Sequence, residues 1–237
     1  MNKKNDFILN SLITKYNLDN KEKKEFINII KNIYYNDNFQ KRFNNTFLHH
    51  GTTSVSEHTL QVAIKTYKLS KKIKNEEYEI DIAVIIAMLH DLYESPWQNS
   101  KIKTRFFNKH GFRHPIEACI NSIYWFPELF KNKKKAEKII DGIIHHMYPL
   151  AVSRFDTDKI NSTELQNFTI IKKIPKENIK LIIKSTSKMK LARLSFSPPK
   201  YKEGRIMSKA DKLISIKQFN NIHDFIALLT GKNKKLK

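Results

Sequence analysis

The sequence predicts an all-α fold, and three observations support this prediction. Apolar residues recur at helical spacing along most of the chain, as in Phe26, Ile30 and Ile33. The 237 residues include only 5 Gly and 7 Pro, too few for a fold that is rich in tight turns. The alternation typical of a half-buried strand is nearly absent. Its one exception is NFTIIKKI, residues 167–174, which fits a short strand.

The N-terminal part is expected to contain three helices. Residues 5–35 predict two amphipathic helices separated near NLDN, with Asp19 as the N-cap of the second. The stretch FLHHGTTSVS is typical of a loop. Ser54 or Ser56 would cap the helix EHTLQVAIKTYKLSKKI, and His58 falls near its first turn.

The middle of the chain continues as helices joined by one long loop. Residues 79–92 are apolar on all sides, which predicts a central, enclosed helix. Residues 98–113 are polar and aromatic and are expected to form the loop. Pro115 is expected at the first position of the helix IEACINSIYWF. The segment KKKAEKIIDGIIHHM predicts another amphipathic helix, which ends before Pro149.

The last predicted helix, GRIMSKADKLISIKQF, begins after Gly204. Its inward face is expected to carry Ile206, Ala210, Leu213 and Ile214. The preceding residues 152–198 are the least regular part, and we interpret them as an insertion that serves as a lid, an arm or a partner surface. The expected organisation is N-terminal helices over 1–45, a core domain over 46–220 with the insertion at about 152–196, and a helix end with a basic tail over 221–237.

Charge and cysteine content limit the function classes. Lys and Arg number 44 against 23 Asp and Glu, a formal net charge of +21. Such a surface attracts polyanions, including nucleotides, nucleic acid and anionic membranes. The single cysteine, Cys119, excludes an internal disulfide and a cysteine-based zinc cluster. Because no apolar run is long enough to span a membrane and the start lacks a signal-peptide pattern, we expect a soluble cytoplasmic protein.

Histidines provide the clearest functional signal. Eight of the nine fall between residues 49 and 146. A single histidine is usually a packed or surface side chain, but several here lie at helix ends or on apolar helices, where a polar group needs a partner. The polar residues in such positions are His58, His90, Asp91, His145, His146 and Asp211. Imidazole and carboxylate groups together suit Zn, Fe, Mn, Ni or Co.

The order His58, His90-Asp91, Asp211 resembles the signature of the HD-domain metal-dependent phosphohydrolase superfamily. Five segments resemble one bacterial subgroup of HD-domain hydrolases: HGTTSVSEHTLQVA, AMLHDLYESPW, HGFRHPIEACINS, HHMYPL and PPKYKEGRIMSKADKL. The resemblance covers roughly residues 35–151 and 197–220. It implies a helical bundle with a five-helix core, from which this chain departs by the long insertion at 152–196.

The resemblance also implies a set of metal ligands. The ligands implied for one divalent ion are His58, His90, Asp91 and Asp211. In members with two ions, Asp91 would bridge them, and His114 and His146 would complete the second site. Their neighbours His110 and His145 are the alternative ligands. We favour two ions, each Mn, Fe, Zn, Ni or Co.

The implied activity is hydrolysis of a phosphate ester, as a phosphomonoesterase or phosphodiesterase. A hydroxide between the two metal ions would attack phosphorus, with Asp91 holding both ions. Glu94 completes the pattern HDxxE, which suggests either a role in proton transfer or an ordinary helix end. Arg113 and Lys109 would bind phosphate or would simply be surface charges, and His50 would line the pocket.

The expected substrate is a phosphorylated small molecule, which we interpret as a nucleotide or a nucleotide-derived compound. A second hypothesis comes from the charge of +21 and the insertion. Under it, the protein binds nucleic acid or nucleotides, and the HD site is sensory or secondary. The two hypotheses differ in whether the histidine and aspartate residues are needed for the main activity.

Overall fold

The computed structural model describes residues 3–44, 47–49, 53–74, 77–93, 110–155, 168–187, 190–191 and 194–218. These residues are mainly helical and their strands are two residues long, so the predicted all-α fold is confirmed. The first helices are α1 (Lys3–Lys15), α2 (Asn20–Tyr34), α3 (Asp37–Gln40), the 3-10 helix η1 (Lys41–Phe43), α4 (Val55–Ser70) and α5 (Ile80–Leu89). The later helices are α6 (His110–Trp125), the 3-10 helix η4 (Pro127–Phe130), α7 (Lys133–His145), α9 (Phe168–Ile171), α10 (Lys176–Thr186) and α11 (Lys202–Gln218).

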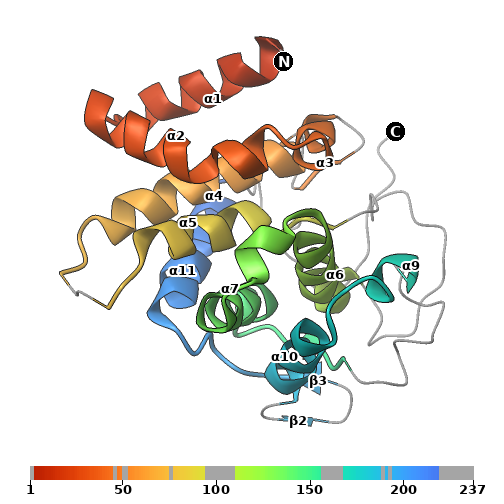
Figure 1. The fold of residues 1–237 in the computed structure, drawn as a ribbon. Helices are drawn as coiled ribbons and strands as arrows, with labels where there is room; N and C mark the ends of the chain where they lie inside the picture. Colours follow the sequence, from red (N-terminus) through yellow and green to blue (C-terminus); the bar gives the residue numbers. More distant parts are fainter. Residues whose placement is uncertain are drawn as a thin grey trace, which may run out of the picture.

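The two N-terminal helices separate at the predicted cap. The Asp19 carboxylate accepts bonds from the backbone N–H groups of Lys21 and Glu22, each at 2.8 Å. The Glu22 carboxylate in turn accepts a bond from the backbone N–H of Asp19, which completes a capping box. Phe26 and Ile30 of α2 belong to the same hydrophobic core as the later helices. Figure 1 shows α1 and α2 lying across α4 and α5.

Helix α5 occupies the centre of the bundle and packs against α2, α4, α7 and α11. Seven of its ten residues are buried, and the exceptions are Ile80 and Asp81 at its start and Ile85. This is expected for a helix that is apolar on nearly all sides. The neighbouring helix α4 is capped by Ser54, whose hydroxyl oxygen accepts a bond from the backbone N–H of Glu57. Ser56 instead donates to the carbonyl oxygen of Phe39 at 2.7 Å. The first turn of α4 is therefore fixed from both sides.

Two predictions of secondary structure are wrong. Helix α6 begins at His110, so the end of the predicted loop is helical and Pro115 lies inside the helix. Proline costs the helix one N–H donor and therefore one backbone hydrogen bond. Burial of the α6 residues from His114 to Ile123 outweighs this lost bond. The predicted strand at 167–174 is also wrong, because Phe168–Ile171 forms the short helix α9. A pattern this short is decided by tertiary packing, here the burial of Ile171.

The inward face of α11 differs from the expected one. Ala210 and Ile214 are buried as predicted, but Leu213 is 37% exposed and Ile206 is only partly buried. Met207 takes the inner position instead. The helix is thus rotated relative to the prediction. The same rotation places the polar side chain of Asp211, which is buried, toward the core.

A close helix crossing explains this rotation. A Cβ atom added at Gly204 of α11 would lie 2.9 Å from Gly142 Cα of α7, which is closer than atoms of packed helices approach. Only glycine therefore allows α11 and α7 to meet at this distance. Asp211, which lies two turns further along α11, faces His58 of α4 and His90 after α5.

The described residues between α7 and α11 form a small unit beside α7. A three-stranded antiparallel sheet has the order β1-β3-β2. Its strands are β1 (Val152–Ser153), β2 (Lys190–Leu191) and β3 (Leu194–Ser195). Helix α10 packs against α7, so this region is attached to the core (Figure 1). That it is an insertion into the core domain stays a prediction, as do the domain boundaries.

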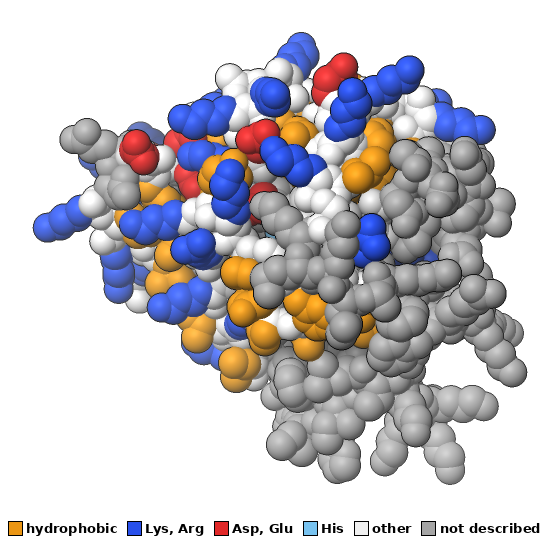
Figure 2. Space-filling model, turned by 90° about the horizontal axis from the view of Figure 1, so that it is seen from below, with side chains coloured by type: hydrophobic (Ala, Val, Ile, Leu, Met, Phe, Trp, Pro, Cys, Tyr) orange, Lys and Arg blue, Asp and Glu red, His pale blue; other side chains and the backbone are white. Residues whose placement is uncertain are grey.

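Basic side chains are spread over the surface. Figure 2 shows Lys and Arg side chains across the lower face, with few Asp or Glu side chains among them. This distribution agrees with the formal charge of +21. Among the described helices, none combines the length and the apolar character that crossing a membrane requires.

Candidate metal centre

Three helices bring two histidines and two aspartates together inside the bundle. His58 lies in the first turn of α4, His90 and Asp91 directly follow α5, and Asp211 lies on α11. The Nε2 atom of His58 is 3.2 Å from Asp211 Oδ1 and 3.8 Å from Asp91 Oδ2. The Nε2 atom of His90 is 3.4 Å from Asp91 Oδ2 and 3.9 Å from Asp211 Oδ1. Ligand atoms of His58, His90 and Asp211 lie within 4.8 Å of one another, close enough to share a cation.

The other oxygen of Asp91 faces two further histidines. Asp91 Oδ1 lies 3.4 Å from the Nε2 atom of His114, on α6, and 3.8 Å from that of His146, at the end of α7. The two Nε2 atoms are 3.1 Å apart. Asp91 therefore stands between two groups of ligand atoms. The name His/Asp cluster is used below for His58, His90, Asp91, His114, His146 and Asp211.

The His/Asp cluster is shielded from solvent. His58 and His90 are 0% exposed and Asp91 is 3% exposed. Burying ionisable groups is costly unless they are paired, hydrogen-bonded or bound to a metal. If ion pairs alone held the His/Asp cluster together, every histidine ring nitrogen would need a partner within the protein. Whether it has one depends on which ring nitrogen of each histidine carries the proton.

Backbone carbonyl groups determine these tautomers. The Nδ1 atoms of His90 and His146 lie 2.7 Å from the carbonyl oxygens of Ala87 and Ile143. The Nδ1 atom of His114 lies 3.1 Å from the carbonyl oxygen of His110. A carbonyl oxygen only accepts, so each Nδ1 must carry the proton. The Nε2 atom of each neutral ring then presents its lone pair to the His/Asp cluster, as in metal-bound histidines.

The close pair His114 and His146 provides a test of whether the residues fit a metal ion. Both Nε2 atoms present lone pairs, and at 3.1 Å they repel each other unless a cation lies beside them. Two nitrogens bound at about 2.1 Å to one ion, at ligand angles of roughly 90–110°, lie about 3.0–3.4 Å apart. In addition, His90 Nε2 is buried and has no hydrogen-bond partner among the described residues. The donor set and its spacing therefore fit divalent transition ions.

The pKa values show how strongly the two carboxylates and the histidines interact. Burial alone would raise the pKa of Asp91, but nearby imidazoles, His90 first, outweigh burial and hold that pKa well below its ordinary value. Burial would also raise the pKa of Asp211, but the bond with His58 and the nearby imidazoles of His90 and His146 together outweigh burial and lower that pKa. Burial lowers the pKa of His146 to about 3, so its ring stays neutral at pH 7. The site thus offers anionic carboxylates, together with neutral imidazoles at His114 and His146, whose pKa values are lowered by burial.

Metal-free protein is expected to lose stability as the pH falls from 7 to 5. Burial holds the pKa of His146 at about 3 and that of His49 at about 4, whereas an unfolded histidine titrates near 6.5. The unfolded chain therefore takes up protons first, which favours unfolding by about 2 kcal/mol for each such group at pH 5. His58, whose pKa is raised, opposes this effect as one group. Thermal unfolding with chelator at pH 7, 6 and 5 measures it, and higher stability at pH 5 would contradict the expectation.

The structure adds His49, which the sequence did not single out. Its Nε2 atom lies 3.0 Å from Asp91 Oδ2, and its ring stacks on that of His58 at 3.6 Å between centroids. A ligand atom of His49 lies within 4.8 Å of those of His58 and Asp91, close enough to share an ion. The adjacent histidines His49 and His50 were visible in the sequence. Helical spacing, which located the other site residues, cannot show where a loop residue such as His49 points.

Of the remaining predicted site residues, His110, Arg113 and His145 lie in the described part of the chain, and three others do not. His145 does not join the His/Asp cluster, because its Nε2 atom lies 3.1 Å from Ser185 Oγ instead. His110 stacks on His114 at 5.0 Å between ring centroids, behind the ligand atoms. Arg113 pairs with Glu117, with Nε and Oε1 2.9 Å apart. The predicted residues His50, Glu94 and Lys109 lie outside the described residues.

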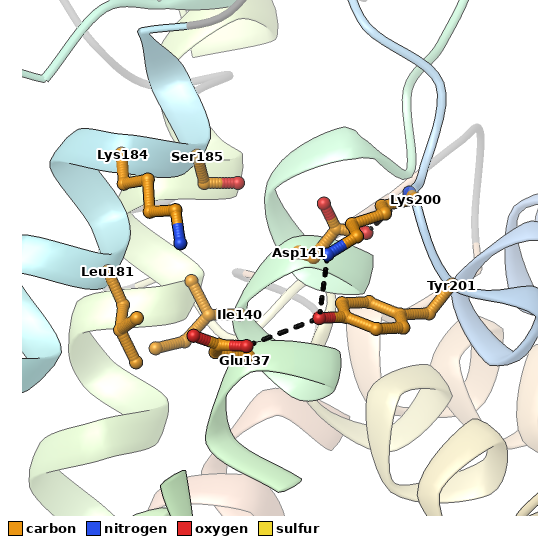
Figure 3. A pocket seen from close by; sticks show the side chains of 8 residues that line it. All are labelled: Glu137, Ile140, Asp141, Leu181, Lys184, Ser185, Lys200 and Tyr201. Carbon is orange, nitrogen blue, oxygen red and sulfur yellow. Dashed lines mark hydrogen bonds between the residues drawn. The ribbon is translucent and has the colours of Figure 1, made fainter. Parts of the chain in front are cut away.

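A small pocket on the opposite side of α7 is separate from this site. Figure 3 shows its lining, which comes from α7, α10 and the segment before α11. Asp141 accepts a bond from the backbone N–H of Lys200 at 2.6 Å, and Tyr201 donates to Glu137 at 3.2 Å. No member of the His/Asp cluster lines it. These bonds attach the segment before α11 to α7, so the pocket is interpreted as part of the packing.

Comparison with known proteins agrees with the geometry. Neither the curated proteins nor the solved structures include a match to this chain. The sequence model of the HD domain matches residues 55–216, about two thirds of the chain and all of the His/Asp cluster. The chain therefore belongs to the HD-domain family of the metal-dependent phosphohydrolase superfamily.

Proposed function

We propose that the protein hydrolyses a phosphate ester, in a nucleotide or a nucleotide-derived substrate, with the help of bound divalent metal ions. The observation that carries this proposal is the buried His/Asp cluster, in which oriented Nε2 atoms meet two carboxylates. Membership of the HD-domain family supports the reaction class. Both phosphomonoester and phosphodiester substrates are compatible with such a site.

The His/Asp cluster would hold two ions of Mn, Fe, Zn, Ni or Co. The first would be held by His58, His90, Asp91 and Asp211, and the second by Asp91, His114 and His146. When bound, such ions polarise a phosphoryl oxygen and lower the pKa of water. Asp91 is the central residue of this proposal, because its two oxygens face the two groups of histidines.

The chain itself supplies orientation and electrostatics. The bonds from the Nδ1 atoms of His90, His114 and His146 to backbone carbonyls hold the rings before any substrate binds, so little reorganisation is needed. His49 is 15% exposed while its partner Asp91 is 3% exposed, which favours substrate entry on the side of His49. The surrounding positive charge raises the local concentration of anionic substrates.

Four further side chains are proposed to act on the substrate. Glu94 would transfer a proton, Lys109 and Arg113 would bind phosphate, and His50 would line the pocket. Arg113 is the member of this set that lies in the described part of the chain. It precedes His114 directly and is 13% exposed in its ion pair with Glu117. This position supports a role at the edge of the site.

The second candidate function is binding of nucleic acid or another polyanion, with the HD site in a secondary role. The basic surface in Figure 2 favours it. Phosphate contacts release counterions, so such binding would weaken steeply as salt rises. If this were the main function, binding would not change when His90 and Asp91 are both replaced by alanine.

The proposed function is tested by a hydrolysis screen. Wild-type protein loaded with Mn²⁺ is expected to release phosphate or a nucleoside monophosphate from at least one member of a nucleotide panel. The H90A/D91A double variant is expected to be inactive, because both ion positions would lose ligands. A metal-loaded wild type that cleaves nothing, or a double variant as active as the wild type, would contradict the proposed function.

A further inference from the structure

An arginine that precedes the HD match is buried beside the metal centre. Arg42 lies in η1, before the matched residues 55–216, and is 1% exposed. Arginine is almost never fully buried unless its charge and its donors are satisfied. The structure shows which groups satisfy them.

The guanidinium of Arg42 binds two backbone carbonyl groups. Its Nε and Nη2 atoms donate to the carbonyl oxygen of Tyr93 at 2.9 and 2.5 Å. Its Nη1 atom donates to the carbonyl oxygen of Asn38. The charged carbon lies 4.9 Å from the ring centroid of Trp125 and 5.4 Å from that of Phe47, within the range of cation–π attraction. The side chain is thus held in one position by α3, α6 and the segment after α5.

This contact fixes the turn that carries Asp91. The carbonyl oxygen of Leu92 accepts a bond from Asn121 Nδ2 on α6, at 2.8 Å. The carbonyl oxygen of Tyr93 is the one bound by Arg42. The two carbonyl groups that follow Asp91 are therefore held from α6 and from η1. Helix α5 ends at Leu89, and one backbone bond, from the N–H of Leu92 to the carbonyl oxygen of Leu89 at 3.2 Å, spans the turn. The contacts to the Leu92 and Tyr93 carbonyl groups add to this single bond in defining where Asp91 points.

We infer that Arg42 is a positioning residue for the metal centre, and that the N-terminal segment through η1 is part of the functional unit rather than an appendage to the HD domain. The inference rests on the proposed function, because it concerns the geometry of the Asp91 carboxylate toward metal ions. Arg42 acts through the Tyr93 carbonyl, two residues from Asp91. Only arginine offers three donors in one plane, so lysine cannot replace both contacts.

The test measures metal affinity in the full chain. R42K keeps the charge but loses the forked contact, and N121A releases the Leu92 carbonyl from the other side. Each is expected to bind Co²⁺ or Mn²⁺ roughly 10-fold more weakly, at the low end of the range for residues that orient metal ligands. Chelator competition gives the affinity, and the Co²⁺ absorption spectrum reports ligand geometry; both are independent of hydrolysis.

F39L is the matched control. Phe39 is 1% exposed and packs on Tyr34 and Phe43 in the same segment, so this change lowers stability without touching the turn. It is expected to keep the wild-type affinity and spectrum. If R42K kept the wild-type affinity and spectrum, or if F39L changed them as much as R42K does, the inference about Arg42 would be overturned. The proposed function would not be affected by either result. A wild type that binds no metal would overturn the proposed function and the inference with it.

Discussion

Replacing Asp91 with asparagine (D91N) is expected to abolish hydrolysis and to remove both metal ions. Asp91 Oδ2 faces His90, and Asp91 Oδ1 faces His114, so one change removes an anionic ligand from both proposed positions. Metal affinity should fall by at least about 100-fold, since even residues that only orient ligands commonly contribute 10- to 100-fold. Hydrolysis should fall by at least roughly 1,000-fold, because losing one stabilising group commonly costs about 100- to 1,000-fold. Chelator competition and phosphate release measure the two effects.

D141N is the matched control for this experiment. Asp141 is also a buried carboxylate, 6% exposed, but it lies on α7 facing the opposite pocket and binds the backbone N–H of Lys200 (Figure 3). Its replacement should cost about 1–2 kcal/mol of stability and leave metal binding intact. If D91N kept wild-type metal affinity, Asp91 would not be a ligand and the proposed function would fail.

Replacing Gly204 with alanine (G204A) is expected to destabilise the protein by about 1–3 kcal/mol. The new Cβ would lie 2.9 Å from Gly142 Cα and 2.9 Å from Pro199 Cβ, so α11 would have to move away from α7. Because Asp211 lies on α11 and His146 at the end of α7, the displacement should also weaken metal binding. Chemical denaturation of the metal-free protein measures the first effect, and metal titration measures the second.

G111A is the control for G204A. Gly111 also lies in a helix, but a Cβ added there would meet no atom within 4 Å. Alanine is the better helix former, so G111A should be neutral or more stable by up to about 1 kcal/mol. Equal stability of G204A and G111A would show that the crossing of α7 and α11 tolerates a larger residue, and would contradict the explanation given for the rotation of α11.

The fold was largely predictable because helical periodicity and caps are local signals. Asp19 was predicted as a cap, and Ser54 was one of two candidates with Ser56; Asp19 and Ser54 form the expected bonds. The errors arose where tertiary packing overrides local preference. Pro115 lies inside α6 because that helix buries its inner face, and Leu213 is exposed because the contact of Gly204 with α7 rotates α11. Neither contact is visible in the sequence near these residues.

The candidate site was predictable where ligands lie on helices and match a known order. His58, His90, Asp91, His114, His146 and Asp211 meet in space, although their role as ligands stays a proposal. Choosing between His145 and His146 needed the structure, because adjacent residues on a helix point about 100° apart. His49 and Arg42 could not be found, since their contacts depend on how a loop and η1 fold back over the turn after α5.

The central claim is that the His/Asp cluster is a metal centre, and metal content tests it most directly. Full-length wild type and D91N are loaded with Mn²⁺ or Co²⁺, dialysed, and analysed by atomic spectroscopy. The prediction is about two ions per wild-type chain, as for a two-metal hydrolase, and essentially none per D91N chain. A wild type that retains no transition metal, or a D91N variant that retains as much as the wild type, would contradict the claim.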